Sequence, residues 1–281
     1  MVEAVARGVA TPSGYSVPVT RFAGREGAPV IIVMAALGMG SHFYAPLARA
    51  MAATGFNVAL VEQRGQGDST LRPSRHDDWG FAEVLCNDLP AVISWARGDR
   101  AAVYLMGHSL GGHYVAMAAG LYPQRIDGVI LVATGSPWRE AFSGAMRNKV
   151  RFLIGVIPVC DLLLGYYPGA RIGFGGNEAR SVMDDWRVLA RSNRYRASGL
   201  DQNLDARVAG YSGGVLAIRL ADDAFVPPAS IDAVTAKFVS ARLTEKTLDA
   251  ETIGDRADHM RWARTPAAVT QAVRDWIGFF V

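Results

Sequence analysis

Ser109 lies in a glycine-flanked segment of the sequence, Gly107-His108-Ser109-Leu110-Gly111. A strand-like apolar run at 102–106 precedes it, and a helix-like pattern at 110–122 follows it. A G-x-S-x-G pattern between a strand and a helix is typical of a sharp turn whose glycines allow close packing and whose serine hydroxyl is exposed. Free N–H groups and the helix dipole favour negative charge at such a place. We therefore predict that Ser109 is a nucleophile; the alternative is a Gly-Ser turn without a chemical role.

Strand-like and helix-like segments alternate on both sides of this turn. Buried strands are predicted at 29–34, 56–61, 102–106, 128–133 and 215–220, with a weaker strand near 246–248. Helices are predicted at 42–54, 77–97, 110–122, 229–240 and 266–279. The alternation predicts an α/β fold, with a mostly parallel sheet, right-handed crossovers and helices on both faces. The stretch 2–22 is expected to form an antiparallel hairpin at the sheet edge.

The alternation stops between 137 and 211, where we expect helices and Gly- and Pro-rich turns but no buried strand. We therefore predict a sheet domain made of 1–136 and 212–281, with 137–211 inserted as a helical cap or lid. Apolar residues at 152–164 either line a pocket for an acyl chain or aromatic group or form the core of the insertion, and the second reading is favoured for most of them. Four arginines are predicted to form a solvated face or, alternatively, to bind a substrate carboxylate: Arg139, Arg147, Arg151 and Arg171.

The composition excludes several classes of protein. With 50% hydrophobic and 20% charged residues among 281, the chain is too apolar to be disordered. The 29 Lys+Arg and 26 Asp+Glu leave a net charge of +3, and no Lys/Arg-dense run suggests a nucleic-acid partner. A signal-peptide pattern and a long apolar run are both missing, so no stable membrane anchor is expected. Metal-ligand spacings and nucleotide-binding glycine loops are missing too, so no metal and no cofactor is predicted.

The two cysteines, Cys86 and Cys160, are too few for a disulfide framework or a four-cysteine zinc site. We expect both to be small buried apolar residues. Free thiols persist in a reducing compartment, so the sequence favours a cytoplasmic location.

A serine nucleophile needs a general base and an acid that orients the base. Among the five histidines, His259 stands in a loop at 254–260 before the last predicted helix, which fits the chain order serine, acid, histidine. Asp222 and Asp223 follow the strand at 215–220, at the sheet edge where open α/β sheets place their sites. From the residues alone, either aspartate could be the acid that orients the histidine.

These segments resemble the α/β-hydrolase superfamily over about 30–135 and 213–275. In that family the acid commonly stands three residues before a Val-Pro pair. Here the pair is Val226-Pro227, so the resemblance implies that Asp223 is the acid and Asp222 a cap or turn residue. It implies a catalytic triad that consists of Ser109, Asp223 and His259.

The resemblance also implies an oxyanion hole formed by the backbone N–H groups of Leu37 and Leu110. Ala35-Ala36 stand where relatives usually have His-Gly, which departs from the family pattern. The segment 62–69 resembles the family's Asp-x-Arg-Gly-x-Gly-x-Ser turn, with Glu in the first position. We predict a structural role for Arg64 in this turn, with substrate binding as the alternative.

Within the superfamily, the chain resembles predicted hydrolases related to the serine aminopeptidases, on segments 44–48, 88–95, 107–112 and 258–260. The predicted function is that of an esterase- or lipase-like serine hydrolase. Its partner would be a small apolar acyl substrate, a carboxylic ester or a thioester or amide, cleaved through an acyl-enzyme. The alternatives are an acyltransferase that uses the same triad and a non-catalytic binding protein of the same fold. A homodimer is left open.

Overall fold

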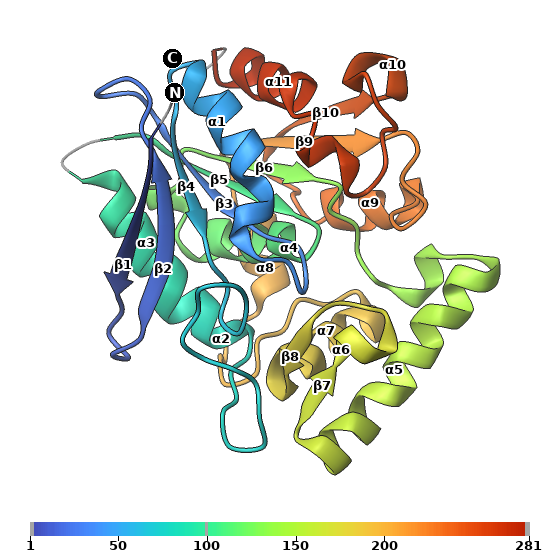
Figure 1. Ribbon diagram of the computed structural model, residues 1–281. Helices are drawn as coiled ribbons and strands as arrows, with labels where there is room; N and C mark the ends of the chain where they lie inside the picture. Colours follow the sequence, from blue (N-terminus) through green and yellow to red (C-terminus); the bar gives the residue numbers. More distant parts are fainter. Residues whose placement is uncertain (1–2, 99–100, 279–281) are drawn as a thin grey trace.

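The central sheet has eight strands in the order β1-β2-β4-β3-β5-β6-β9-β10. The computed structural model describes residues 3–98 and 101–278 (Figure 1). The strands are β1 (Ala4–Ala10), β2 (Ser16–Phe22), β3 (Val30–Met34), β4 (Asn57–Val61), β5 (Val103–His108), β6 (Gly128–Val132), β9 (Gly214–Leu220) and β10 (Arg242–Leu248). Strands β4, β3, β5, β6, β9 and β10 pair in parallel, whereas β1 and β2 form an antiparallel hairpin at one edge. The predicted α/β fold is confirmed. Val2, where the predicted hairpin begins, and Phe279, where the last predicted helix ends, lie outside the described residues.

Helices cover both faces of the sheet because its inner strands are apolar on both faces. Successive side chains of a strand point to opposite faces, and β3 shows the result. Ile31 and Val33 belong to the core under α1 and α11, whereas Ile32 and Met34 belong to the core under α3 and α4. The four helices are α1 (Ala45–Ala53), α3 (Leu89–Arg97), α4 (Leu110–Leu121) and α11 (Ala267–Gly278).

A π-helical turn at Val84–Asp88 interrupts the helix predicted at 77–97, between α2 (Phe81–Glu83) and α3. Val84 and Leu85 are buried, but Cys86 is exposed, so the expectation that both cysteines are buried is wrong for Cys86. Cys160 is buried as expected, and both thiols are free.

The chain between β6 and β9 forms a group of helices and one small hairpin to one side of the sheet (Figure 1). It contains α5 (Gly144–Leu164), β7 (Tyr166–Pro168), α6 (Gly169–Ile172), β8 (Asn177–Ala179) and α7 (Arg180–Ser192), whereas α8 (Leu204–Ala209), which follows α7, packs against α4 next to the sheet. The expectation of no buried strand here is wrong, because β7 and β8 pair and bury Tyr167 and Glu178. Strands of three residues are too short to show an alternating pattern in the sequence.

Helix α5 is the most apolar part of this segment and continues through Pro158. One stripe of the helix is buried, including Val150 and Leu153, while Phe152 and Leu162 are 60% and 77% exposed. No helix in the described ranges 3–98 and 101–278 has the length and apolar character needed to cross a membrane.

The remaining short helices follow strand ends and turns. They are α9 (Pro228–Thr235), α10 (Ala250–Ile253) and the 3₁₀ turns at Ser41–Tyr44, Pro123–Arg125, Arg139–Ala141 and Arg261–Ala263. The helix predicted at 229–240 therefore ends earlier, at Thr235, and the helix predicted at 42–54 begins with a 3₁₀ turn.

Candidate active site

Ser109 connects β5 to α4 in a backbone conformation that non-glycine residues rarely adopt. Its φ is 51° and its ψ is −116°. The turn is held on both sides: the N–H of Ser109 donates to the carbonyl of Val132 at 3.2 Å, and the N–H of Gly112 donates to the carbonyl of Ser109 at 3.0 Å. A non-glycine residue in this region is strained, and such strain persists only where the surrounding structure enforces it. The neighbouring strand β6 and the first turn of α4 supply that enforcement.

The flanking glycines are required by the close approach of strand and helix at this turn. A Cβ atom on Gly107 would lie 2.3 Å from the carbonyl oxygen of Gly111. A Cβ atom on Gly111 would lie 2.2 Å from the carbonyl oxygen of Met34. Any side chain at either position would therefore push α4 away from the sheet and move Ser109 with it.

His259 is paired with Asp223 through a short hydrogen bond. His259 Nδ1 lies 2.7 Å from Asp223 Oδ2, and the side chains of His259 and Asp223 are 11% and 1% exposed. The other carboxylate oxygen, Asp223 Oδ1, accepts hydrogen bonds from the N–H groups of Phe225 and Val226 at 2.8 and 3.1 Å. An ionised carboxylate only accepts hydrogen bonds, so Nδ1 carries the proton in this pair. The Nε2 atom of His259 is then the basic nitrogen.

Asp222, the other aspartate of the pair, makes a different set of contacts. Its Oδ2 accepts a hydrogen bond from the N–H of Ala257 at 3.0 Å, and its own N–H donates to the carbonyl of Ala257, also at 3.0 Å. Ala257 stands two residues before His259. Asp222 therefore fixes the loop that carries the histidine, while Asp223 contacts the imidazole itself.

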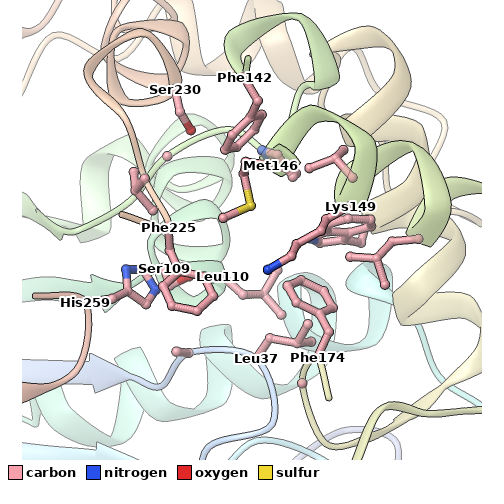
Figure 2. Close-up of a pocket in the computed structure, with 18 of the residues that line it drawn as sticks. Leu37, Ser109, Leu110, Phe142, Met146, Lys149, Phe174, Phe225, Ser230 and His259 are labelled. Atoms are coloured by element: carbon pink, nitrogen blue, oxygen red, sulfur yellow. The ribbon is translucent and has the colours of Figure 1, made fainter. Parts of the chain in front are cut away.

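Ser109 and His259 open onto one cavity of about 630 Å³. Figure 2 shows the imidazole of His259 lying toward Ser109, with Leu110 and Leu37 on the other side of the serine. The structure thus brings four of the five predicted site residues to the cavity wall, with Asp223 behind His259. Most of the remaining lining is apolar and includes Phe142, Met146, Val150, Phe152, Leu153, Ile172, Phe174, Trp186, Phe225 and Met260.

Side chains from two other segments hold the loop that carries Leu37. Gln63 Nε2 donates to the carbonyl of Ala35 at 2.5 Å, and the N–H of Ala36 donates to the hydroxyl of Tyr44 at 3.0 Å. The sequence analysis gave neither Gln63 nor Tyr44 a role. Both residues lie in segments that resemble the family. Their place in those segments was the signal that could have identified them. Leu110 is the first residue of α4, so helix geometry itself fixes the direction of its N–H group. The first N–H groups of a helix have no intrahelical partner, which leaves this one able to bind a ligand.

Two further histidines lie close to the site, and both are neutral. Tyr44 lies 2.7 Å from His108 Nδ1, and burial together with the charge of His259 lowers the pKa of His108 well below its ordinary value. Burial also lowers the pKa of His113 to about 4. His113 Nδ1 lies 2.9 Å from the Tyr195 hydroxyl and Nε2 lies 3.1 Å from the carbonyl oxygen of Gly135. His113 is thus held by hydrogen bonds at both ring nitrogens, and His108 by one at Nδ1.

Arg64 lies away from the cavity and has a structural role, as predicted. Its guanidinium donates two hydrogen bonds of 2.8 Å to the carboxylate of Asp88 and lies 4.5 Å from the ring centroid of Tyr15. Arg64 and Asp88 are both buried. A bidentate ion pair of this kind fixes the 62–69 turn against the helix that follows it.

Comparison with known proteins places the fold in a family. Residues 27–192, more than half of the chain, match the family described as serine aminopeptidase, S33. The chain belongs to this α/β-hydrolase family. The matched range includes Leu37, Ser109 and Leu110, whereas Asp223 and His259 lie beyond it.

Each match to a curated relative covers only part of that relative's sequence. Human protein ABHD12B is 32% identical over 118 residues, which is 39% of this chain and 30% of the relative. A 1-acylglycerol-3-phosphate O-acyltransferase from Arabidopsis thaliana is 27% identical over 194 residues, 59% of this chain and 44% of the relative. A probable esterase, PIR7A, from Oryza sativa subsp. indica is 27% identical over 113 residues, 40% of this chain and 41% of the relative. The chain therefore spans less than half the length of each of these relatives.

Solved structures agree with the fold over nearly the whole chain. Est1E from Butyrivibrio proteoclasticus, described with bound ferulic acid, superposes with a TM-score of 0.65 at 15% identity, covering 97% of this chain and 98% of that one. At this level of identity the similarity concerns the fold.

Proposed function

We propose that the protein is a serine hydrolase that cleaves a carboxylic ester, or a thioester or amide, through an acyl-enzyme on Ser109. One observation carries the proposal: a serine on a strained strand-to-helix turn shares a cavity with a histidine whose other ring nitrogen lies 2.7 Å from a buried carboxylate. Nucleophile, base and orienting acid in this relation are the parts that covalent acyl transfer needs.

Each step assigns a task to a residue of the chain. Ser109 Oγ attacks the substrate carbonyl carbon while His259 Nε2 accepts the hydroxyl proton. Asp223 stabilises the imidazolium that forms. His259 then donates the proton to the leaving oxygen, sulfur or nitrogen, the bond to the leaving group breaks, and a water molecule activated by His259 releases the acid from Ser109.

The oxyanion of each tetrahedral intermediate would accept hydrogen bonds from the N–H groups of Leu37 and Leu110. Donors fixed in place before the reaction need no reorganisation, and removal of one side-chain donor of this kind costs about 3 kcal/mol of transition-state stabilisation. The hydrogen bonds from Gln63 and to Tyr44 would keep the Leu37 loop in that position.

We also propose that 137–211 acts as a cap that supplies the substrate pocket. Residues of α5 and of the turn after α6 form the wall opposite Ser109, including Met146, Leu153 and Phe174. An apolar cavity of about 630 Å³ suits a small apolar acyl group. Free thiols at Cys86 and Cys160 support the proposal of a cytoplasmic location.

Acyl transfer to an alcohol or amine is the second candidate. Similarity to a plant protein described as an acyltransferase favours it, because an acyl-enzyme can react with an acceptor in place of water. Adding a small alcohol during ester cleavage tests it. Formation of the new ester in proportion to acceptor concentration supports transfer, and formation of free acid alone supports hydrolysis.

Burst kinetics with para-nitrophenyl esters test the proposed function. We expect the wild-type protein to release up to one equivalent of nitrophenol rapidly and Ser109→Ala to show no burst. Ser212→Ala is the matched control, since Ser212 is exposed and lies in a second G-x-S-x-G segment, Gly210-Tyr211-Ser212-Gly213-Gly214, that leads into β9. Turnover that survives in Ser109→Ala, or disappears in Ser212→Ala, would contradict the assignment. A folded wild type with no turnover and no burst would favour the non-catalytic binding protein.

A further inference from the structure

We propose that Lys149 binds an anionic group on the acyl part of the substrate, so that the preferred substrates are esters of apolar acids with a second, charged end. This inference rests on the proposed function and specifies its substrate class. Figure 2 shows the amine of Lys149 pointing into the cavity, toward the region between Leu110 and Phe174.

The spacing of residues along α5 places Lys149 on the helix face that forms the cavity wall. Met146, Lys149, Val150 and Leu153 all line the cavity and follow one another at intervals of three, one and three residues. Positions i, i+3, i+4 and i+7 share one face of an α-helix. Lys149 therefore occupies a place in an otherwise apolar stripe, where a purely structural wall would carry a fourth apolar side chain.

The charge of Lys149 has no counter-ion in the described part of the protein. No carboxylate in 3–98 or 101–278 forms an ion pair with it, and none of the described residues that line the cavity is Asp or Glu. Lys149 is also the single Lys or Arg in that described lining. A solvent-exposed cation at the wall of an apolar cavity, with no carboxylate beside it, is complementary to an anion brought by the ligand.

The arginines considered as carboxylate ligands in the sequence do not line the cavity. Arg139 and Arg147 form ion pairs with Glu140, at 3.1 and 3.9 Å. Arg151 and Arg171 are exposed on the same segment and are absent from the lining. The alternative of a carboxylate site on these arginines is therefore replaced by one on Lys149.

The position of Lys149 relative to His259 indicates which end of the substrate carries the anion. Figure 2 shows His259 on one side of Ser109 and the Lys149 amine on the other. His259 would protonate the leaving group, so the leaving group lies on its side and the acyl chain extends the opposite way. The anion is thus expected at the far end of the acyl chain, with apolar carbons between it and the ester.

Lys149 is exposed, so the bound anion would keep part of its hydration. The ion pair is then of moderate strength and sensitive to salt. These properties suit a specificity contact that binds and releases an acid product.

A matched pair of esters measures the effect. The para-nitrophenyl monoester of adipate and para-nitrophenyl hexanoate have acyl chains of equal length and differ by the terminal carboxylate. We expect wild type to favour the adipate ester in kcat/KM and Lys149→Met to lower that preference about tenfold, between the effects typical of exposed and of charge-assisted pairs. Lys149→Glu should reverse the preference, and high salt should reduce it in wild type alone.

Arg151→Gln is the control, since it removes one positive charge from an exposed position on the same helix outside the cavity. It should leave the preference unchanged. Equal preferences in wild type and Lys149→Met, or an equal loss in Arg151→Gln, would overturn the inference while leaving the hydrolase intact.

Calorimetry separates failure of the inference from failure of the proposed function. The Ser109→Ala protein would be titrated with both esters, with and without Lys149→Met. Tighter binding of the adipate ester that depends on Lys149 supports the anion site even if the wild-type protein cleaves neither ester. Equal binding of the two esters contradicts the site whatever the catalytic result.

Discussion

The two walls of the cavity are built in different ways. On the sheet side, Ser109 is held by backbone hydrogen bonds on a strained turn, and Asp223 accepts three hydrogen bonds that fix His259. On the side of α5, the wall is formed mainly by packed apolar side chains, and Phe152 is 60% exposed. Directional hydrogen bonds therefore position the proposed catalytic residues, whereas we propose that the shape of the α5 side and the charge of Lys149 select the substrate. Changes to the sheet side should therefore affect kcat, and changes to the α5 side should affect the choice of substrate.

The largest effect is expected from the nucleophile and the base. Ser109→Ala or His259→Ala should lower kcat for a para-nitrophenyl ester by about 10⁴- to 10⁶-fold, because neither residue works without the other. Their double variant should be no worse than either single one. Additive losses in the double variant would show that the two residues do not act as a unit.

The adjacent aspartates Asp222 and Asp223, both on the sheet side, are expected to have different roles. Asp223→Asn should lower kcat about 10⁴-fold, because an amide at this position favours the wrong tautomer of His259. Asp222→Ala should lower the free energy of unfolding by about 1 to 3 kcal/mol, since the N–H of Ala257 loses its partner, and should reduce kcat far less. Similar losses of kcat in both variants, measured by steady-state kinetics, would contradict the separate roles.

Glu178, in β8, contacts the 62–69 turn and is expected to cause a pH effect on stability. Its Oε1 accepts hydrogen bonds from Gln66 Nε2 at 3.2 Å and from the N–H of Gly176 at 3.1 Å, and burial raises the pKa of Glu178 to about 7. The folded state therefore binds this proton more tightly than the unfolded state. The stabilisation that protonated Glu178 contributes is complete below pH 4.5, the ordinary value, and is lost as pH rises toward 7.

Glu178→Gln keeps the hydrogen-bond acceptor and removes the charge. We expect this variant to be more stable than wild type by up to about 3 kcal/mol at about pH 8, with little difference at about pH 4. Urea unfolding at the two pH values measures the difference. His113 should have the opposite pH dependence, because its pKa is lowered from 6.5 to about 4 and the wild-type fold therefore loses stability as pH falls below 6.5. The stability of His113→Gln relative to wild type should thus rise as pH falls. Equal stability of Glu178→Gln and wild type at both pH values would contradict burial of an ionisable Glu178.

The smallest effect is expected on the α5 side. Phe174 lines the cavity and lies 5.4 Å from Trp186, between ring centroids. Phe174→Ala should raise KM for a hexanoate ester more than for an acetate ester, by a ratio of about tenfold, because the longer chain loses more apolar contact. A uniform fall in kcat for both esters would place Phe174 with the catalytic machinery instead.

The turn at Ser109 could be predicted because local sequence determines it. The G-x-S-x-G pattern alone was insufficient, since Gly210-Tyr211-Ser212-Gly213-Gly214 has the same form. That second segment enters β9 at its amino end, away from the edge where Ser109 lies. Of the two segments, the one at Ser109 has a strand before it and a helix directly after it.

Other parts of the site depend on contacts that a single sequence does not display. The choice between Asp222 and Asp223 required the family resemblance, because both follow the same strand. The role of Lys149 depends on which face of α5 meets the cavity, and tertiary packing decides that face. The hairpin that buries Glu178 is too short for a periodic pattern. The exposure of Cys86, by contrast, agrees with the helical spacing around it, since Phe81, Val84, Leu85 and Leu89 mark the buried face of this segment.

Labelling with a fluorophosphonate, followed by peptide mapping, tests the central claim most directly. The probe reacts with a serine only when a base activates it. We predict one adduct per wild-type molecule, located on Ser109, lost in Ser109→Ala and His259→Ala and retained in Ser212→Ala. An adduct on a different serine, or undiminished labelling of Ser109 in the folded His259→Ala protein, would contradict activation of Ser109 by His259.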